Sequence, residues 1–134
     1  MEETLNAYKE DFELFDDDMD KYEYIIELGK KSPVLKEEDK NEQNKIQGCQ
    51  SSVWIVAREE NGKLFFDTDS DTVIVRGLAY ILAHIYSSRS PEEIQSFDRE
   101  KLRALNLEEI ISPLRLNGFT SMINTIYAYA NKEK

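Results

Sequence analysis

The sequence is poor in the residue types that most catalytic and metal sites require. Its 134 residues include one cysteine and one histidine, whereas a zinc or iron–sulfur site needs several such ligands. A cysteine protease is disfavoured as well, because His84 lies between apolar neighbours of an expected helix and is best interpreted as structural. The five glycines form no phosphate-binding loop, so nothing indicates nucleotide chemistry.

Long hydrophobic runs and a positive charge excess are also missing. No apolar stretch approaches the roughly 18 residues that a membrane span requires. The N-terminus is acidic and resembles no secretory signal, so we expect a cytoplasmic protein, and a lone free thiol fits that reducing compartment. A net charge of −10 disfavours a nucleic-acid partner. The length predicts one domain spanning residues 1–134.

The acidic residues gather in the first third of the chain, at residues 16–18 and 37–39. We interpret these clusters as a solvated face, with docking on a basic partner surface as the alternative. Apolar spacings of three and four predict a helix over residues 3–15. A second helix follows, with Asp17 or Asp18 as its N-cap and Gly29 at its end, and the apolar-free residues 36–44 predict an exposed loop.

The hydrophobic period changes after Lys45. Residues 53–56 are β-branched or aromatic and are joined through Asn61-Gly62 to residues 64–66, which predicts a hairpin. A short strand over residues 45–47 would pair with this hairpin. The sequence therefore predicts a small antiparallel three-stranded sheet, with Cys49 in the turn between the first and second strands.

Helical patterns follow the predicted sheet. Residues 69–71, Asp-Ser-Asp, can cap a helix whose apolar stripe runs to about Ser87. Residues 90–93, SPEE, form a capping box that starts a short helix to about Phe97. Less regular turns fill residues 99–111, and a closing helix carries apolar residues 119–130. The whole pattern predicts an α+β protein with its sheet packed against helices.

Cys49 stands in a setting that is unusual for a core cysteine. Gly48 precedes it and three polar residues, 50–52, follow it, whereas buried cysteines normally lie inside apolar runs. We interpret it as a thiol at an exposed turn, with an inert core cysteine as the alternative. Only the thiolate is a nucleophile, and sulfur exchange needs no separate general base. Thiol exchange is therefore the chemistry that the residues leave open.

Residues 44–56, NKIQGCQSSVWIV, resemble the central motif of the SufE/CsdE family, the sulfur acceptors of cysteine desulfurases in iron–sulfur cluster assembly. Three further segments agree with this family in order and spacing. Residues 24–29, YIIELG, resemble its first core helix, and residues 69–78, DSDTVIVRGL, resemble its second. Residues 112–118, SPLRLNG, resemble the start of its last helix, so the resemblance spans nearly the whole chain from about Asp20.

The resemblance implies an IscU/SufE-like fold that holds no cluster itself. It implies that a pyridoxal-phosphate (PLP) cysteine desulfurase of the SufS/CsdA type passes persulfide sulfur to Cys49, which delivers it to an iron–sulfur scaffold or another recipient. PLP then belongs to the partner, and this chain needs no cofactor or metal. It would activate the desulfurase rather than act as a stand-alone enzyme. The expected partner-binding residues are Gly48, Gln50, Ser51, Asp69 and Arg115, with a helix cap as the alternative role for Asp69.

Two rival functions remain open at this point. An IscU-like cluster scaffold would need three cysteine ligands, and only Cys49 is present. A single-cysteine thiol peroxidase would form a sulfenic acid on the same thiol, but the thioredoxin-like alternation of strands and helices is missing. For sulfur transfer we expect Gly48 to act as a hinge, because glycine alone reaches positive φ cheaply.

Overall fold

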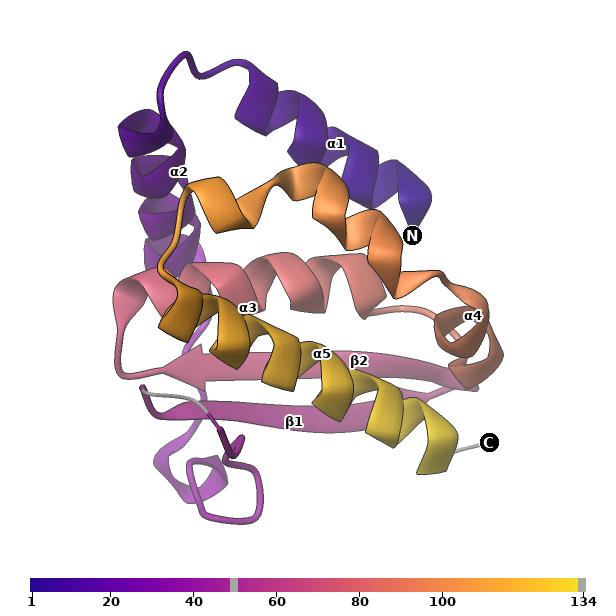
Figure 1. The fold of residues 1–134 in the computed structure, drawn as a ribbon. Helices are drawn as coiled ribbons and strands as arrows, with labels where there is room; N and C mark the ends of the chain where they lie inside the picture. Colours follow the sequence, from indigo (N-terminus) through magenta and orange to yellow (C-terminus); the bar gives the residue numbers. More distant parts are fainter. Residues whose placement is uncertain (49–50, 133–134) are drawn as a thin grey trace.

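The structure, a computed structural model, describes residues 1–48 and 51–132 (Figure 1). These residues form an α+β fold in which a hairpin is covered on one face by helices. In chain order the elements are α1 (Glu2–Glu13), α2 (Asp18–Lys31), 3-10 helix η1 (Glu37–Asp39), β1 (Val53–Glu60), β2 (Lys63–Ser70), α3 (Val73–Tyr86), α4 (Pro91–Ser96), 3-10 helices η2 (Arg99–Leu105) and η3 (Leu107–Glu109), and α5 (Pro113–Lys132).

Helix α3 lies at the centre of the fold. It packs on β2 and also contacts α1, α2 and α5 (Figure 1). A helix that is apolar on most of its circumference is stable only when other elements surround it. The buried residues of α3 are Ile74, Val75, Gly77, Leu78, Ala79, Ile81, Leu82, Ile85 and Tyr86.

The predicted hairpin is confirmed. Asn61 and Gly62 both have positive φ, 54° and 79°, which is the backbone that an Asn-Gly turn provides. The antiparallel register runs from Glu60 opposite Lys63 to Val53 opposite Ser70. The turn chemistry therefore fixes which residues of the two strands face each other.

The sheet has two strands within the described residues, so the prediction of three was wrong. Lys45 forms only an isolated bridge with Trp54. Two backbone hydrogen bonds flank it, from Ile46 N–H to the Val53 carbonyl (2.8 Å) and from Ile55 N–H to the Asn44 carbonyl (3.0 Å). The pairing stops there because the chain turns on both sides. The side chain of Asn41 accepts from the backbone N–H of Asn44, and Gly48 has φ +86°.

Gly29 does not end α2, which continues to Lys31. It is buried instead where α2 crosses α3. A Cβ at Gly29 would collide with the Val73 carbonyl, and one at Gly77 would collide with the Ile25 carbonyl. The two glycines therefore let the backbones of α2 and α3 approach closely, which the interpretation of glycine as a helix stop could not anticipate.

The predicted helix starts are confirmed at two places and wrong at a third. Asp17 caps α2 by accepting from the Asp20 N–H, and Ser90 and Glu93 form the capping box of α4. The N-cap of α3 is Thr72, which makes no side-chain cap bond. Asp69 belongs to β2, so its alternative role as a helix cap is wrong.

The closing helix α5 is confirmed, and it packs against α3 and α4. It starts with Pro113, whose missing N–H costs nothing at a first helical position. Its buried side is formed by Phe119, Met122, Ile123 and Ile126. Among the described residues, no helix is both long and apolar enough to cross a bilayer.

Candidate functional site

The candidate site is the predicted turn that contains Cys49. Cys49 and Gln50, two of the predicted site residues, lie outside the described residues. The residues on either side are described, and they define the stem of the turn at one end of the sheet (Figure 1). The geometry of the site is therefore described by Gly48 on one side of Cys49 and by Ser51 and Ser52 on the other.

Gly48 has φ +86°, the positive value expected for the residue before the nucleophile. This region favours glycine, because a side chain there is strained. A Cβ at Gly48 would also meet the Ser121 hydroxyl of α5 at 3.1 Å. Gly48 therefore lies beside Ser121 of α5, while its role as a hinge stays a prediction.

The residues after the turn are bonded to the junction between β2 and α3. The hydroxyl of Thr72 donates to that of Ser51 at 2.9 Å. The Ser52 carbonyl accepts from the Ser70 hydroxyl at 2.7 Å and from the Asp71 N–H at 3.3 Å. Ser51 is half-buried, and this side of the stem is fixed by polar contacts.

Asp69 is buried, with 1% of its surface exposed. One carboxylate oxygen, Oδ1, accepts from the Ser70 N–H at 2.8 Å and lies 3.3 Å from Arg76 Nε. The other, Oδ2, accepts from the Leu35 N–H at 3.0 Å and lies 3.3 Å from Lys40 Nζ. A buried carboxylate acts on a docked protein only through the residues that it holds.

Lys40 contacts both this carboxylate and Trp54, the residue opposite Asp69 in the register of the two strands. Its Nζ lies 5.8 Å from the ring centre of Trp54, at cation–π distance. The hydrogen bond to Asp69 holds the pKa of Lys40 above its usual value, with Glu37 acting in the same direction. Lys40 therefore stays charged near neutral pH and remains a partner of the buried carboxylate.

Arg115 lies in the first turn of α5 and is half-buried. Its backbone N–H donates to the Ser112 hydroxyl at 3.3 Å. Within the part of the chain that the structure describes, its guanidinium forms no ion pair, and its neighbour Leu114 is 58% exposed. A guanidinium of this kind beside an exposed leucine suits a protein contact, and the role of Arg115 stays a prediction.

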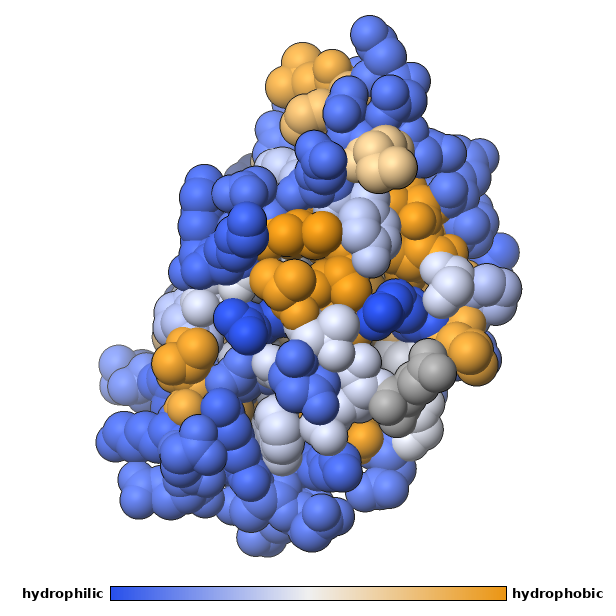
Figure 2. Space-filling view, turned by 90° about the vertical axis from the view of Figure 1, so that its left-hand side faces the viewer, coloured by the Kyte–Doolittle hydropathy of each residue, from blue (hydrophilic) through white to orange (hydrophobic). Residues whose placement is uncertain are grey.

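The side of the molecule that carries α2 and the first turns of α3 and α5 is not uniformly polar. Figure 2 looks directly onto it and shows apolar side chains gathered at the centre, with hydrophilic ones around them. A contiguous apolar area with a polar rim is typical of a protein contact surface. Ser51 of the stem is bonded to Thr72 at the start of α3, and Gly48 lies beside Ser121 of α5.

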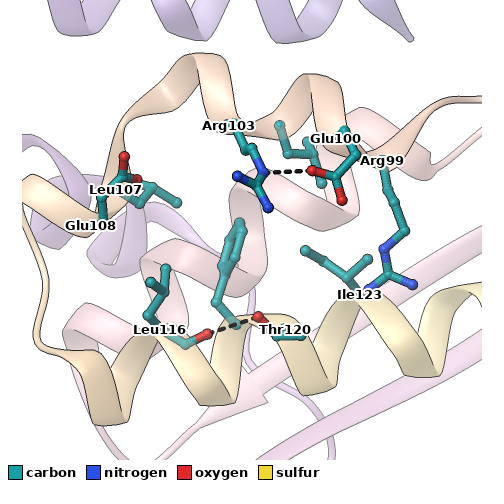
Figure 3. Close-up of a pocket in the computed structure, with 10 residues that line it drawn as sticks. Arg99, Glu100, Arg103, Leu107, Glu108, Leu116, Thr120 and Ile123 are labelled. Carbon is teal, nitrogen blue, oxygen red and sulfur yellow. Dashed lines mark hydrogen bonds and ion pairs between the residues drawn. The ribbon is translucent and has the colours of Figure 1, made fainter.

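A separate cavity of about 470 Å³ lies between η2 and α5 (Figure 3). Its apolar lining includes Leu102, Leu116 and Phe119, and Arg103 and Glu100 form an ion pair of 2.5 Å at its rim. None of the described site residues lines it. The cavity is therefore not part of the candidate site.

The contacts of His84 favour a structural role over that of a general base. Its Nδ1 shares a hydrogen bond of 2.7 Å with the Tyr8 hydroxyl, and the two rings meet edge to face. Burial raises the pKa of the Tyr8 phenol, so this hydroxyl stays protonated at neutral pH. The pair joins α1 to α3, which agrees with the structural interpretation of His84.

Several residues that shape the site were missed by reasoning from sequence. Ser121 lies beside Gly48, Thr72 is bonded to Ser51, and Lys40 is paired with Asp69, from three different parts of the fold. Thr72 lies within the resembling segment 69–78 but was not singled out, and Ser121 and Lys40 lie in no such segment. Each acts through a contact that only the tertiary fold creates. Ser70 could have been found more easily, since it directly follows the acidic residue that the motif comparison selected.

Comparison with known proteins gives two independent findings. Residues 6–130 match the SufE family, described as an Fe-S metabolism associated domain. Among solved structures, the fold is similar to the solution structure of a hypothetical protein from Thermus thermophilus. The TM-score is 0.78 at 23% identity, covering 97% of this chain and 95% of the other. The structural likeness supports the α+β fold, and the family match indicates iron–sulfur metabolism.

Proposed function

The chain belongs to the SufE family, and on that premise we propose that it accepts sulfur from a cysteine desulfurase onto Cys49 and delivers it for iron–sulfur cluster assembly. The family places the chain in iron–sulfur metabolism. The donor, the recipient and the residue that carries the sulfur are our proposal. The observation that carries it is the geometry on either side of Cys49: Gly48 has positive φ and lies beside Ser121 of α5, and Ser51 is bonded to Thr72 at the start of α3.

The proposed reaction is a thiol exchange without net oxidation. The Cys49 thiolate attacks the terminal sulfur of a persulfide on the desulfurase. A new sulfur–sulfur bond forms on Cys49, the sulfur–sulfur bond of the donor breaks, and the donor cysteine leaves as a thiolate. A second exchange of the same kind passes the sulfur to a scaffold or another recipient, which regenerates the Cys49 thiolate.

The described residue after Gln50 lies beside the start of a helix. Ser51, two residues after Cys49, is bonded to Thr72, the N-cap of α3. The N-terminus of a helix carries a partial positive charge, which stabilises an anion within about one turn.

The proposal assigns PLP to the desulfurase and no cofactor to this chain. Gly48, Gln50, Ser51 and Arg115 would contact the partner around the sulfur, whereas Asp69 would act from inside the fold. The protein would stimulate the desulfurase by removing its persulfide, and it would work in the cytoplasm.

Intact-mass measurement tests the proposal directly. Incubation with a SufS/CsdA-type desulfurase and cysteine is expected to add one sulfur atom to the parent protein and none to Cys49→Ser. One sulfur and two oxygen atoms add nearly the same mass, so a thiol reductant must separate them: a persulfide reverts, whereas a sulfinic acid does not. Sulfur uptake by Cys49→Ser would refute the assignment.

A positional control makes this test sharper. The double variant Cys49→Ser with Ser51→Cys keeps one thiol but moves it two positions along the turn. Exchange requires a thiol at the correct place, because the donor sulfur is held on another protein. We expect this variant to take up sulfur more slowly than the parent, and an equal rate would mean that the turn does not position its nucleophile.

A further inference from the structure

Asp69 is a buried carboxylate that takes no direct part in the proposed sulfur exchange. It lies one residue from the end of β2, opposite Trp54. An ionised side chain at 1% exposure is costly unless its oxygens are paired. Both oxygens are paired, and their partners belong to two different regions of the chain.

The two oxygens of Asp69 face in two directions. Oδ1 is bonded to Ser70 and paired with Arg76, at the junction between β2 and α3. Oδ2 is bonded to Leu35 and paired with Lys40, in the segment that leads toward Cys49. One side chain thus joins the residues before the turn to the strand end that holds the residues after it, where Ser70 bonds the Ser52 carbonyl.

The segment before the turn has few other attachments. Among residues 33–48, all of which are described, only Ile46 is buried. Two backbone hydrogen bonds connect Asn44 and Ile46 to β1, and Lys40 lies over Trp54. Because little apolar surface is buried, the position of this segment depends mainly on polar contacts, of which Asp69 accepts two.

We propose that Asp69 is a positioning residue whose carboxylate clamps residues 35–46 to the β2–α3 junction and thereby sets the stem of the Cys49 turn. The clamp is a property of the fold. Its consequence for sulfur transfer rests on the proposed function. The four donors around the carboxylate explain why an amide cannot replace it: an asparagine would turn its own N–H groups toward one pair of donors.

Amide hydrogen exchange tests the clamp without any partner. In Asp69→Asn we expect exchange at Leu35 and Ile46 to become about tenfold faster, while the core of α3 stays protected. Ile46 is the decisive position, because it is not among the residues bonded to Asp69 and responds only if the whole segment loosens. Unchanged exchange at Ile46 would overturn the clamp, and so would an equal rise in every element, which indicates a role in global folding alone.

Asp67→Asn is the matched control. Asp67 lies two residues earlier on the same face of β2, but it is 43% exposed and pairs with Arg58 at 2.7 Å. The chemical change is identical, and the hydrogen bonds and ion pair of Asp67 go to Arg58, outside residues 35–46. We expect parental exchange at Leu35 and Ile46 in this control, and loosening equal to that of Asp69→Asn would overturn the proposal.

Single-turnover sulfur transfer from a persulfide-loaded desulfurase then separates positioning from docking. In Asp69→Asn the maximal rate is expected to fall about tenfold, with a half-saturating concentration within about twofold of the parent. The reason is that a loosened stem presents the turn correctly only part of the time. An unchanged maximal rate with weaker half-saturation would assign Asp69 to docking and overturn the proposal.

Lys40→Met keeps the test decisive if Asp69→Asn does not fold. It removes one of the two cations and leaves an apolar side chain beside Trp54. Exchange at Ile46 and the transfer rate should change in the same direction as in Asp69→Asn, and parental values for both would overturn the clamp. If the parent itself took up no sulfur, the proposed function would be wrong, while exchange at Ile46 would still decide the clamp.

Discussion

The α2–α3 crossing and the segment before Cys49 are held in opposite ways. The crossing is so close that Gly29 and Gly77 each face a backbone carbonyl of the other helix. Residues 35–46 depend instead on hydrogen bonds, ion pairs and one buried side chain, Ile46. Close packing cannot loosen without losing many contacts at once, whereas a polar attachment is released by changing one group. The fold thereby combines a rigid interior with a segment that can be adjusted.

The largest effect is expected from a substitution at the α2–α3 crossing. Gly77→Ala should lower the free energy of unfolding by about 3 kcal/mol, because the new Cβ forces α2 and α3 apart. Urea denaturation measures this loss. The sign of this change is informative, because the higher helix propensity of alanine would by itself stabilise the protein by about 1 kcal/mol.

Gly29→Ala is the matched variant for this prediction, because it places a methyl group on the other helix of the same crossing. It should destabilise the protein as well. In both variants, amide hydrogen exchange at Ile46 should become faster only as far as the lower free energy of global unfolding requires. Increased stability in either variant would contradict the view that backbone contact fixes the crossing.

A smaller effect is expected from a substitution next to Cys49. Gly48→Val should slow sulfur transfer by at least about tenfold, equivalent to roughly 1.4 kcal/mol in the barrier, with much less effect on unfolding. Valine disfavours φ +86°, and its Cβ meets the Ser121 hydroxyl at 3.1 Å. Single-turnover transfer and urea denaturation measure the two quantities.

Combining Gly48→Val with Ser121→Gly separates the two causes. This second change removes the hydroxyl that the new side chain would meet, but the backbone strain at position 48 remains. Slow transfer should therefore persist in the double variant. Full recovery would assign the effect to crowding against α5, and parental kinetics in Gly48→Val alone would show that the turn works without positive φ.

The smallest effect is expected from metal removal, which should alter neither the α2–α3 crossing nor the segment before Cys49. Because the sequence supplies one cysteine and one histidine, we expect no stoichiometric metal in the purified protein. Elemental analysis before and after chelator treatment, together with thermal unfolding, checks this. Near-equimolar iron or zinc, or a melting temperature lowered by the chelator, would favour the scaffold function instead.

The sequence could predict what short-range chemistry decides. Asn61-Gly62 has one favourable hairpin geometry, Ser90 and Glu93 cap the same helix start, and Asp17 lies where the N-cap must be. The positive φ of Gly48 agrees with the expectation that glycine, which reaches positive φ cheaply, precedes the nucleophile. Each of these features depends on residues that are at most three positions apart.

Features that depend on distant partners could not be predicted. Gly29 serves as a packing position because Val73 of α3 lies against it. The expected strand at residues 45–47 shrinks to one bridge because turns on both sides divert the chain. Asp69 was selected by the family motif, but neither its burial nor its bonds to Leu35 and Lys40 can be inferred from its neighbours in sequence.

The hairpin turn at Asn61-Gly62 offers a practical attachment point for reporter groups. A Cβ at Gly62 would have no atom within 4 Å, so the turn is surrounded by open space, and a label on the exposed neighbour Lys63 keeps the glycine that the φ of +79° requires. The eight residues of β1 separate it from the stem of the Cys49 turn by about 25 Å. That separation suits energy transfer between a fluorophore on the hairpin and an acceptor on a docked desulfurase, which would record each encounter without touching the reactive thiol.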